Sequence, residues 1–148
     1  MAAITAPKPQ QPNPVEIQQW QQGASNARQG YDQESARLTY MRNQAQQSYG
    51  MQNQQAAYNN RLQRQGFDDP YIGRGIFNSG IRKAGLSGMY QQQANEAANR
   101  QFDYTSTMGG YNLQDYLAMQ GRDTTINNLQ QQELARRAQL AAEIKGII

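Results

Sequence analysis

Apolar and small residues recur at alternating spacings of three and four over the first third of the chain. The positions are Ile17, Trp20, Ala24, Ala27, Tyr31, Glu34, Leu38, Met41, Ala45 and Ser48. This spacing is typical of a coiled-coil seam, in which one face of a helix packs against a partner helix. Ala24 and Ala27 permit close helix approach, whereas Glu34 and Ser48 make the seam marginal. The pattern predicts a long helix over residues 15–65.

Residues 1–14 precede this helix and contain four prolines, at positions 7, 9, 12 and 14. Prolines at this density disfavour helix and favour an extended path. We expect an extended proline-rich arm that is either disordered by itself or laid against neighbouring subunits. At its end, Asn13 can cap a helix, Pro14 suits the first helical position and Glu16 suits the reciprocal contact of a capping box.

Residues 66–88 have a different character and predict a glycine-rich connector. Six glycines interrupt this segment, and Asp69-Pro70 is typical of a turn. The segment also holds the densest cluster of large apolar residues in the chain, formed by Ile72, Ile76, Phe77, Ile81 and Leu86. Ser79 can cap a short helix over residues 80–87. We therefore expect an ordered, packed connector.

Helical spacing of apolar residues returns over residues 89–148 and predicts a second helical segment. Gly109-Gly110 and Gly121 mark expected kinks or breaks in it, so that continuity is left open. The end of the segment is rich in strong helix formers and places Leu140 and Ile144 near one face. That face is expected to pack against a partner.

These elements predict an all-α fold in which two long helical segments, arranged as a hairpin or a bent rod, flank a glycine-rich connector. Hydrophobic residues make up 37% of the chain, below the roughly 45–50% of typical globular domains. Gln and Asn account for 38 of 148 residues. Because such a chain buries little apolar surface by itself, we expect it to assemble with other chains. Intrinsic disorder of the isolated chain is the alternative.

The side chains expected to make the contacts between chains come from the first seam, the connector and the last segment. They are Ile17, Trp20, Ala24, Ala27, Tyr31, Leu38, Met41, Ile76, Phe77, Ile81, Leu140 and Ile144. Gly23, Gly30 and Gly50 each cost about 1 kcal/mol relative to Ala in a helix interior. Neighbouring helices must offset that cost, or the first helix breaks.

The composition removes most classes of catalytic site. The chain has no His and no Cys, so the usual general base, the commonest metal ligands and thiolate chemistry are missing. Asp68-Asp69, the one adjacent carboxylate pair, is best explained by a turn or a helix cap. Gly73-Arg74-Gly75 lacks the spacing of phosphate-binding loops. We expect no enzymatic activity, cofactor, metal site or small-molecule substrate.

Charge gives a weak indication of partners. The net charge is +3, and the arginines are spread along the chain from Arg28 to Arg137 and form no patch. Non-specific DNA contact through helices bearing Arg and Tyr is the alternative to a structural role. The sequence has no apolar run long enough to span a bilayer and does not begin with a secretory hydrophobic region, so we expect no stable membrane span.

Gln- and Ala-rich helices with scattered Tyr and Arg, together with the central element Arg74-Gly75-Ile76-Phe77-Asn78-Ser79-Gly80, resemble small helical structural proteins of tailed bacteriophage virions. The resemblance is one of composition over most of the chain plus that short element. It implies a virion part present in several symmetric copies, in the head-to-tail connector, the tail or the DNA-ejection apparatus. Its expected partners are further copies or other virion proteins, and it implies no catalytic residues.

Overall fold

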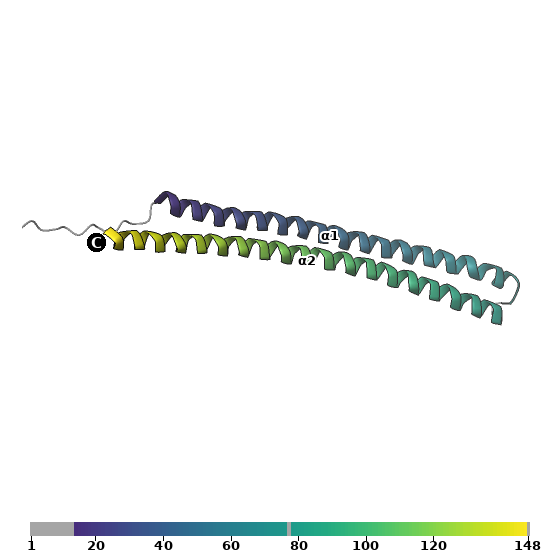
Figure 1. The fold of residues 1–148 in the computed structure, drawn as a ribbon. Coiled ribbons are helices and arrows are strands. Elements are labelled where there is room, and N and C mark those ends of the chain that lie inside the picture. Colours follow the sequence, from purple (N-terminus) through teal and green to yellow (C-terminus); the bar gives the residue numbers. More distant parts are fainter. Residues whose placement is uncertain (1–13, 77, 148) are drawn as a thin grey trace, which may run out of the picture. The chain divides into compact units, whose positions relative to one another are not determined.

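The computed structural model describes residues 14–76 and 78–147. These residues form two helices, α1 (Pro14–Gly73) and α2 (Gly80–Ile147), joined by a short linker (Figure 1). The prediction of an all-α fold built from two long helical segments is confirmed. The expected arm and the cap at Asn13 lie outside the described residues, as does Phe77.

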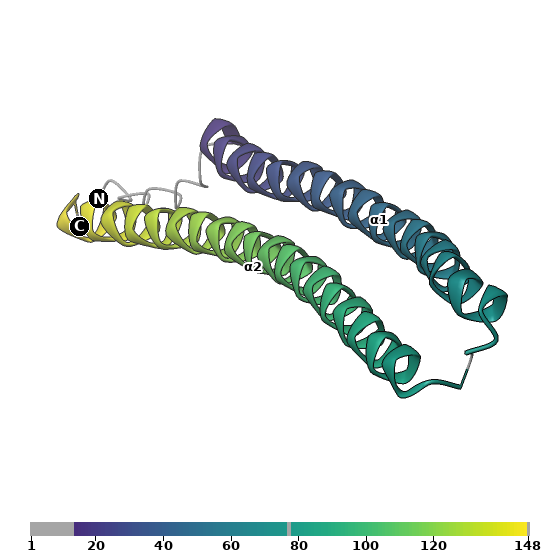
Figure 2. The ribbon, with the colours of Figure 1, turned by 90° about the vertical axis from the view of Figure 1, so that its right-hand side faces the viewer.

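The two helices form two compact units. Among the described residues, the terminal unit comprises 14–37 and 115–147, and the linker unit comprises 38–76 and 78–114. In each unit a part of α1 lies antiparallel beside a part of α2, as Figures 1 and 2 show. In the linker unit, where residues 74–79 join the two helices, this antiparallel pairing forms a helical hairpin.

Each helix is continuous through its glycines. α1 contains 60 residues and α2 contains 68, so the breaks expected at Gly109-Gly110 and Gly121 do not occur. Glycine weakens a helix by about 1 kcal/mol, but it does not remove a backbone hydrogen bond. Gly23 even allows close packing, because a Cβ there would lie 3.0 Å from Cδ1 of Leu129 on α2. Packing of α2 against α1 therefore compensates for part of this weakness.

The expected boundaries of the connector are wrong. α1 continues eight residues beyond 65, with Pro70 inside it, and only residues 74–79 separate α1 from α2. Pro70 is tolerated because it lies in the last turn, where the carbonyl of Gly66 that loses its donor belongs to an exposed residue. The Asp69-Pro70 sequence is thus part of the helix and does not form the predicted turn.

The turn lies five residues later, at Gly75. This residue has a φ of 68°, in the left-handed region that favours glycine. The amide of Gly75 donates to the carbonyl of Ile72 (3.1 Å), and the amide of Ile76 donates to the carbonyl of Tyr71 (3.1 Å). These two bonds form a Schellman motif, which ends α1.

Ser79 begins α2, as the sequence predicted. Its Oγ accepts a hydrogen bond from the amide of Arg82 (3.2 Å), and its carbonyl accepts one from the amide of Lys83 (3.2 Å). This is the geometry of a helix N-cap. The capped helix does not stop at residue 87 but continues to Ile147.

Candidate interaction surface

The predicted contact residues divide into two groups according to burial. Ala24 and Leu38 are the two buried apolar residues of the described chain, at 3% and 0% exposure. Ile17, Trp20, Ala27, Tyr31, Met41, Leu140 and Ile144 are half-buried. The seven of them on α1 recur at spacings of three, four or seven residues and therefore follow one face of that helix. Whether any of them also contacts another chain stays a prediction.

The connector residues behave differently from the seam residues. Ile76 is 44% exposed and Ile81 is 77% exposed. The expectation of a packed apolar connector is therefore wrong for these two side chains. Their backbones serve the Schellman motif and the first turn of α2, and both side chains line an open cleft with Phe67 and Tyr71.

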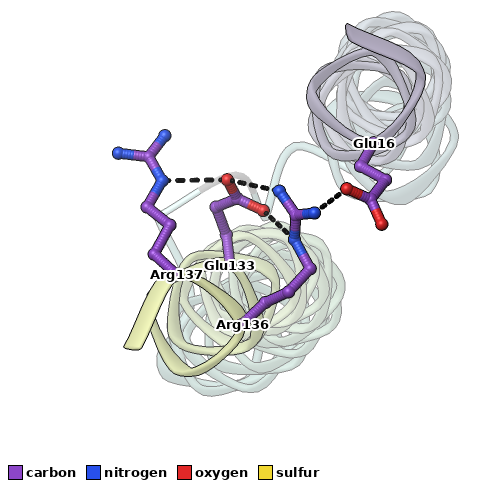
Figure 3. A network of polar contacts seen from close by, with 4 residues as sticks. All are labelled: Glu16, Glu133, Arg136 and Arg137. Atoms are coloured by element: carbon purple, nitrogen blue, oxygen red, sulfur yellow. Dashed lines mark hydrogen bonds and ion pairs between the residues drawn. The ribbon is translucent and has the colours of Figure 1, made fainter. Parts of the chain in front are cut away.

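A network of charged side chains lies at the α1–α2 seam of the terminal unit (Figure 3). Arg136 on α2 forms an ion pair with Glu16 on α1 and a two-bonded pair with Glu133, at 3.1 and 3.2 Å. Arg137 also donates to Glu133, at 3.0 Å. Glu16, expected to complete a capping box, therefore contacts the opposite helix.

Trp20 lies beside this network and lines an open groove with Ile17 and Leu134. Its indole Nε1 is buried and has no hydrogen-bond partner among the described residues. A buried N–H without an acceptor costs about 1–3 kcal/mol. Further along the seam, the guanidinium of Arg122 lies 4.5 Å from the centre of the Tyr31 ring, in a cation–π contact.

The seam of the linker unit is polar and aromatic. Tyr49 and Tyr104 stack with their ring centres 4.5 Å apart, and the Tyr49 hydroxyl donates to Gln101. Arg100 donates to the side-chain oxygen of Asn53 at 3.2 Å. Tyrosine, asparagine and arginine thus occupy half-buried positions that aliphatic residues fill in an ordinary coiled coil.

The helices meet closely near the linker. Asp68 on α1 accepts two hydrogen bonds from Arg82 on α2, at 2.9 and 2.7 Å. The ring of Phe67 lies directly over Gly85. Asp68, which the sequence assigned to a turn or a cap, instead joins the two helices, and no local sequence signal distinguishes these roles.

Large apolar side chains remain on the surface of both units. Among the described residues, fourteen such side chains are 44–77% exposed, including Tyr40, Met51, Tyr58 and Leu62 on α1 and Phe102 and Leu113 on α2. Apart from Ile76 and Ile81, none of the fourteen is among the contact residues predicted from the sequence, because that prediction followed a single seam on α1. A second search for residues repeating every eleven positions would have found Tyr40, Met51 and Leu62.

Much of the charge is paired within the chain. Ion pairs with carboxylates are formed by Arg37, Arg82, Arg122, Arg136 and Arg137. Hydrogen bonds from Arg37 hold the pKa of Glu34 below its ordinary value. This pairing reduces the positive charge available to an external polyanion.

Residues 14–76 and 78–147 contain no group of three or more acidic, His or Cys side chains placed to hold a metal ion. Neither helix has, within its described length, a stretch apolar enough to cross a bilayer. Comparison with known proteins finds no matching family model, no similar protein of curated function and no matching solved structure.

Proposed function

We propose that this chain is a non-enzymatic structural protein of a tailed bacteriophage virion, a helical component of the head-to-tail connector, the tail or the DNA-ejection apparatus. One observation supports the proposal that the chain assembles with other protein chains. Two apolar residues are buried in the described chain, while fourteen large apolar side chains are exposed. Isolated chains rarely leave so much apolar surface in water, so other protein surfaces are expected to cover it. The virion assignment rests on the resemblance in composition and in the element at residues 74–80.

Incorporation into particles tests this proposal. Particles made from the genome that encodes the chain would be purified, washed at high salt and analysed by quantitative mass spectrometry. We expect the chain in a fixed number of copies per particle, retained after the wash. Its absence from particles, or a copy number that varies between preparations, would contradict a structural role in the virion.

Binding to nucleic acid remains the alternative function. It predicts an affinity that falls steeply with salt, because each neutralised phosphate releases counterions. The internal ion pairs of Arg82 and Arg136 favour the structural role, since these side chains are already engaged. A titration of labelled DNA between roughly 50 and 200 mM salt separates the two functions. Strong, salt-sensitive binding would favour the alternative.

A disordered Gln-rich scaffold is the other alternative. It predicts that the isolated chain shows little helix by circular dichroism and gains none when partners are added. The paired helices described above predict the opposite, a strongly helical spectrum. If the chain still gives the circular dichroism spectrum of a disordered protein when the other components of purified particles are added, the scaffold function is favoured.

A further inference from the structure

The face of α1 that points away from the seam carries a regular stripe in the linker unit. The outer stripe consists of Tyr40, Gln44, Gln47, Met51, Gln55, Tyr58 and Leu62. All seven residues are exposed, and the four large ones are 67%, 65%, 57% and 48% exposed for Tyr40, Met51, Tyr58 and Leu62. Their spacings are four, three and four, repeated twice. This eleven-residue repeat keeps the stripe on one face, because 3.67 residues per turn is close to the helical value.

The outer stripe is symmetric about Met51. Tyr40 and Leu62 each lie eleven residues from it, Gln44 and Tyr58 each lie seven residues from it, and Gln47 and Gln55 each lie four residues from it. When two copies of such a helix pack antiparallel about a two-fold axis at Met51, position 40 meets position 62. A two-fold interface requires this reciprocity, in which residue i contacts j and j contacts i.

The absence of charge indicates what kind of partner fits. From Asn43 to Asn60, α1 carries no charged residue. The stripe therefore offers nothing to a polyanion or to a strongly charged protein. Its glutamine amides each present donors and an acceptor, so an identical surface satisfies them. A surface made of neutral amides and partly exposed Tyr, Met and Leu side chains is therefore complementary to a second copy of itself.

Charge also selects the direction of pairing. Arg61 is exposed at the edge of the stripe. Parallel pairing in register would bring it against Arg61 of the partner subunit, and like charges placed opposite each other are destabilising. Antiparallel pairing about Met51 instead places it near the partner's Met41, which is neutral.

The area is compatible with a specific interface. At half to two-thirds exposure, each of the four large side chains offers on the order of 100 Å², given that aromatic side chains bury 150–250 Å². The apolar part then supplies roughly half of the about 800 Å² per partner that stable interfaces bury. The intervening glutamines are positioned to supply the rest.

We infer that the outer stripe of α1 is the contact between two copies of this chain, packed antiparallel about a two-fold axis at Met51. The inference adds detail to the proposed function. It rests on that function for one point alone, the expectation that copies of the chain assemble. It also separates two roles, because the seam pairs α1 with α2 within one chain and the outer stripe pairs α1 with α1 of the partner.

Cysteine cross-linking of the full-length chain tests the geometry, and the natural absence of Cys makes single-cysteine variants unambiguous. Facing helices lie 8–10 Å apart between axes, within reach of a disulfide for residues on the symmetry axis. Met51→Cys alone is expected to form a covalent dimer on mild oxidation. Tyr40→Cys and Leu62→Cys are each expected to form no disulfide-linked dimer alone and to form a disulfide-linked heterodimer when mixed.

Phe102→Cys is the matched control, since Phe102 is 71% exposed on α2 of the same unit. Cross-linking of Phe102→Cys as fast as Met51→Cys would show random collision and overturn the inference. Rapid self-cross-linking of Tyr40→Cys would indicate parallel pairing and overturn it as well. Failure of every variant and mixture to form a cross-linked dimer would also overturn the inference.

Sedimentation equilibrium gives an independent test. Met51→Lys is expected to raise the dimer dissociation constant at least about tenfold, because it places two lysines together at the axis, whereas Phe102→Lys leaves it unchanged. Circular dichroism of both variants shows whether they still fold. If the unmodified chain is a monomer at every protein concentration, the inference is overturned, whereas the proposal that the chain is part of a virion is not affected. A dimer that is absent from particles would overturn the proposed function and leave this inference intact.

Discussion

The ring of Phe67 on α1 lies so close over Gly85 on α2 that a Cβ at residue 85 would come within 2.5 Å of its Cζ atom. Gly85→Ala must therefore displace the ring or separate the helices. We expect it to lower the free energy of unfolding by about 1–3 kcal/mol, the usual cost of overpacking. Urea unfolding followed by circular dichroism at one fixed protein concentration measures this, since self-association would otherwise change the apparent stability.

Gly88 provides the control for Gly85. It lies one turn further along α2, and nothing is within 4 Å of a Cβ built there. Gly88→Ala is expected to stabilise the chain by up to about 1 kcal/mol, because alanine is the better helix former. Equal stabilisation by alanine at both positions would show that Phe67 does not pack over Gly85.

Ser79 is expected to contribute to stability through its side chain. Its Oγ accepts the hydrogen bond from the Arg82 amide that begins α2. Ser79→Ala should lower the free energy of unfolding by about 1 kcal/mol, whereas Ser79→Asp should largely preserve it. Ser87→Ala, at an exposed position inside α2, is the control and should be neutral or slightly stabilising. The idea fails if the two serine-to-alanine changes have the same effect.

Leu38 has the most buried side chain in the described residues, at 0% exposure. Leu38→Ala should cost about 2–5 kcal/mol, since it removes buried methyl groups and leaves a cavity. Leu113→Ala is the matched change at a residue that is 58% exposed, and it should alter stability by no more than about 0.5 kcal/mol. Similar losses at both positions would contradict the assignment of Leu38 to the seam.

Local patterns were sufficient to predict the helical class and some of its details. The three-and-four spacing through Ala24 and Leu38 marked the seam, and both residues are buried. The cap at Ser79 was also predicted, because an N-cap depends on one side chain and the next three amides. Such features are decided within a few residues, which is why the sequence reveals them.

Features that depend on the opposite helix could not be predicted in this way. Asp69-Pro70 has a turn composition, yet α1 continues through it, since contacts of Phe67 and Asp68 with α2 hold that turn in place. The pairing of Glu16 with Arg136 joins residues 120 positions apart, and only the register of the two helices brings them together. Tertiary contacts override local propensity in both cases.

The register of the terminal unit can be tested through Arg136, which is 23% exposed and bridges Glu16 and Glu133. Arg136→Met would leave Glu16 without this partner, so we expect a loss of about 1 kcal/mol that becomes smaller in roughly 1 M salt, where charges are screened. Arg137→Met is the control, because Arg137 is 57% exposed and contacts Glu133 on its own helix. It should change stability by less than about 0.5 kcal/mol.

A double-mutant cycle with Glu16→Gln then isolates the contact between the helices. If α1 and α2 pair in this register, the effects of Glu16→Gln and Arg136→Met are not additive, because each change removes the same ion pair. The combination of Glu16→Gln with Arg137→Met should be additive. Additivity in both cycles would mean that Glu16 and Arg136 do not meet in solution, and the pairing register of the terminal unit would then have to be reassigned.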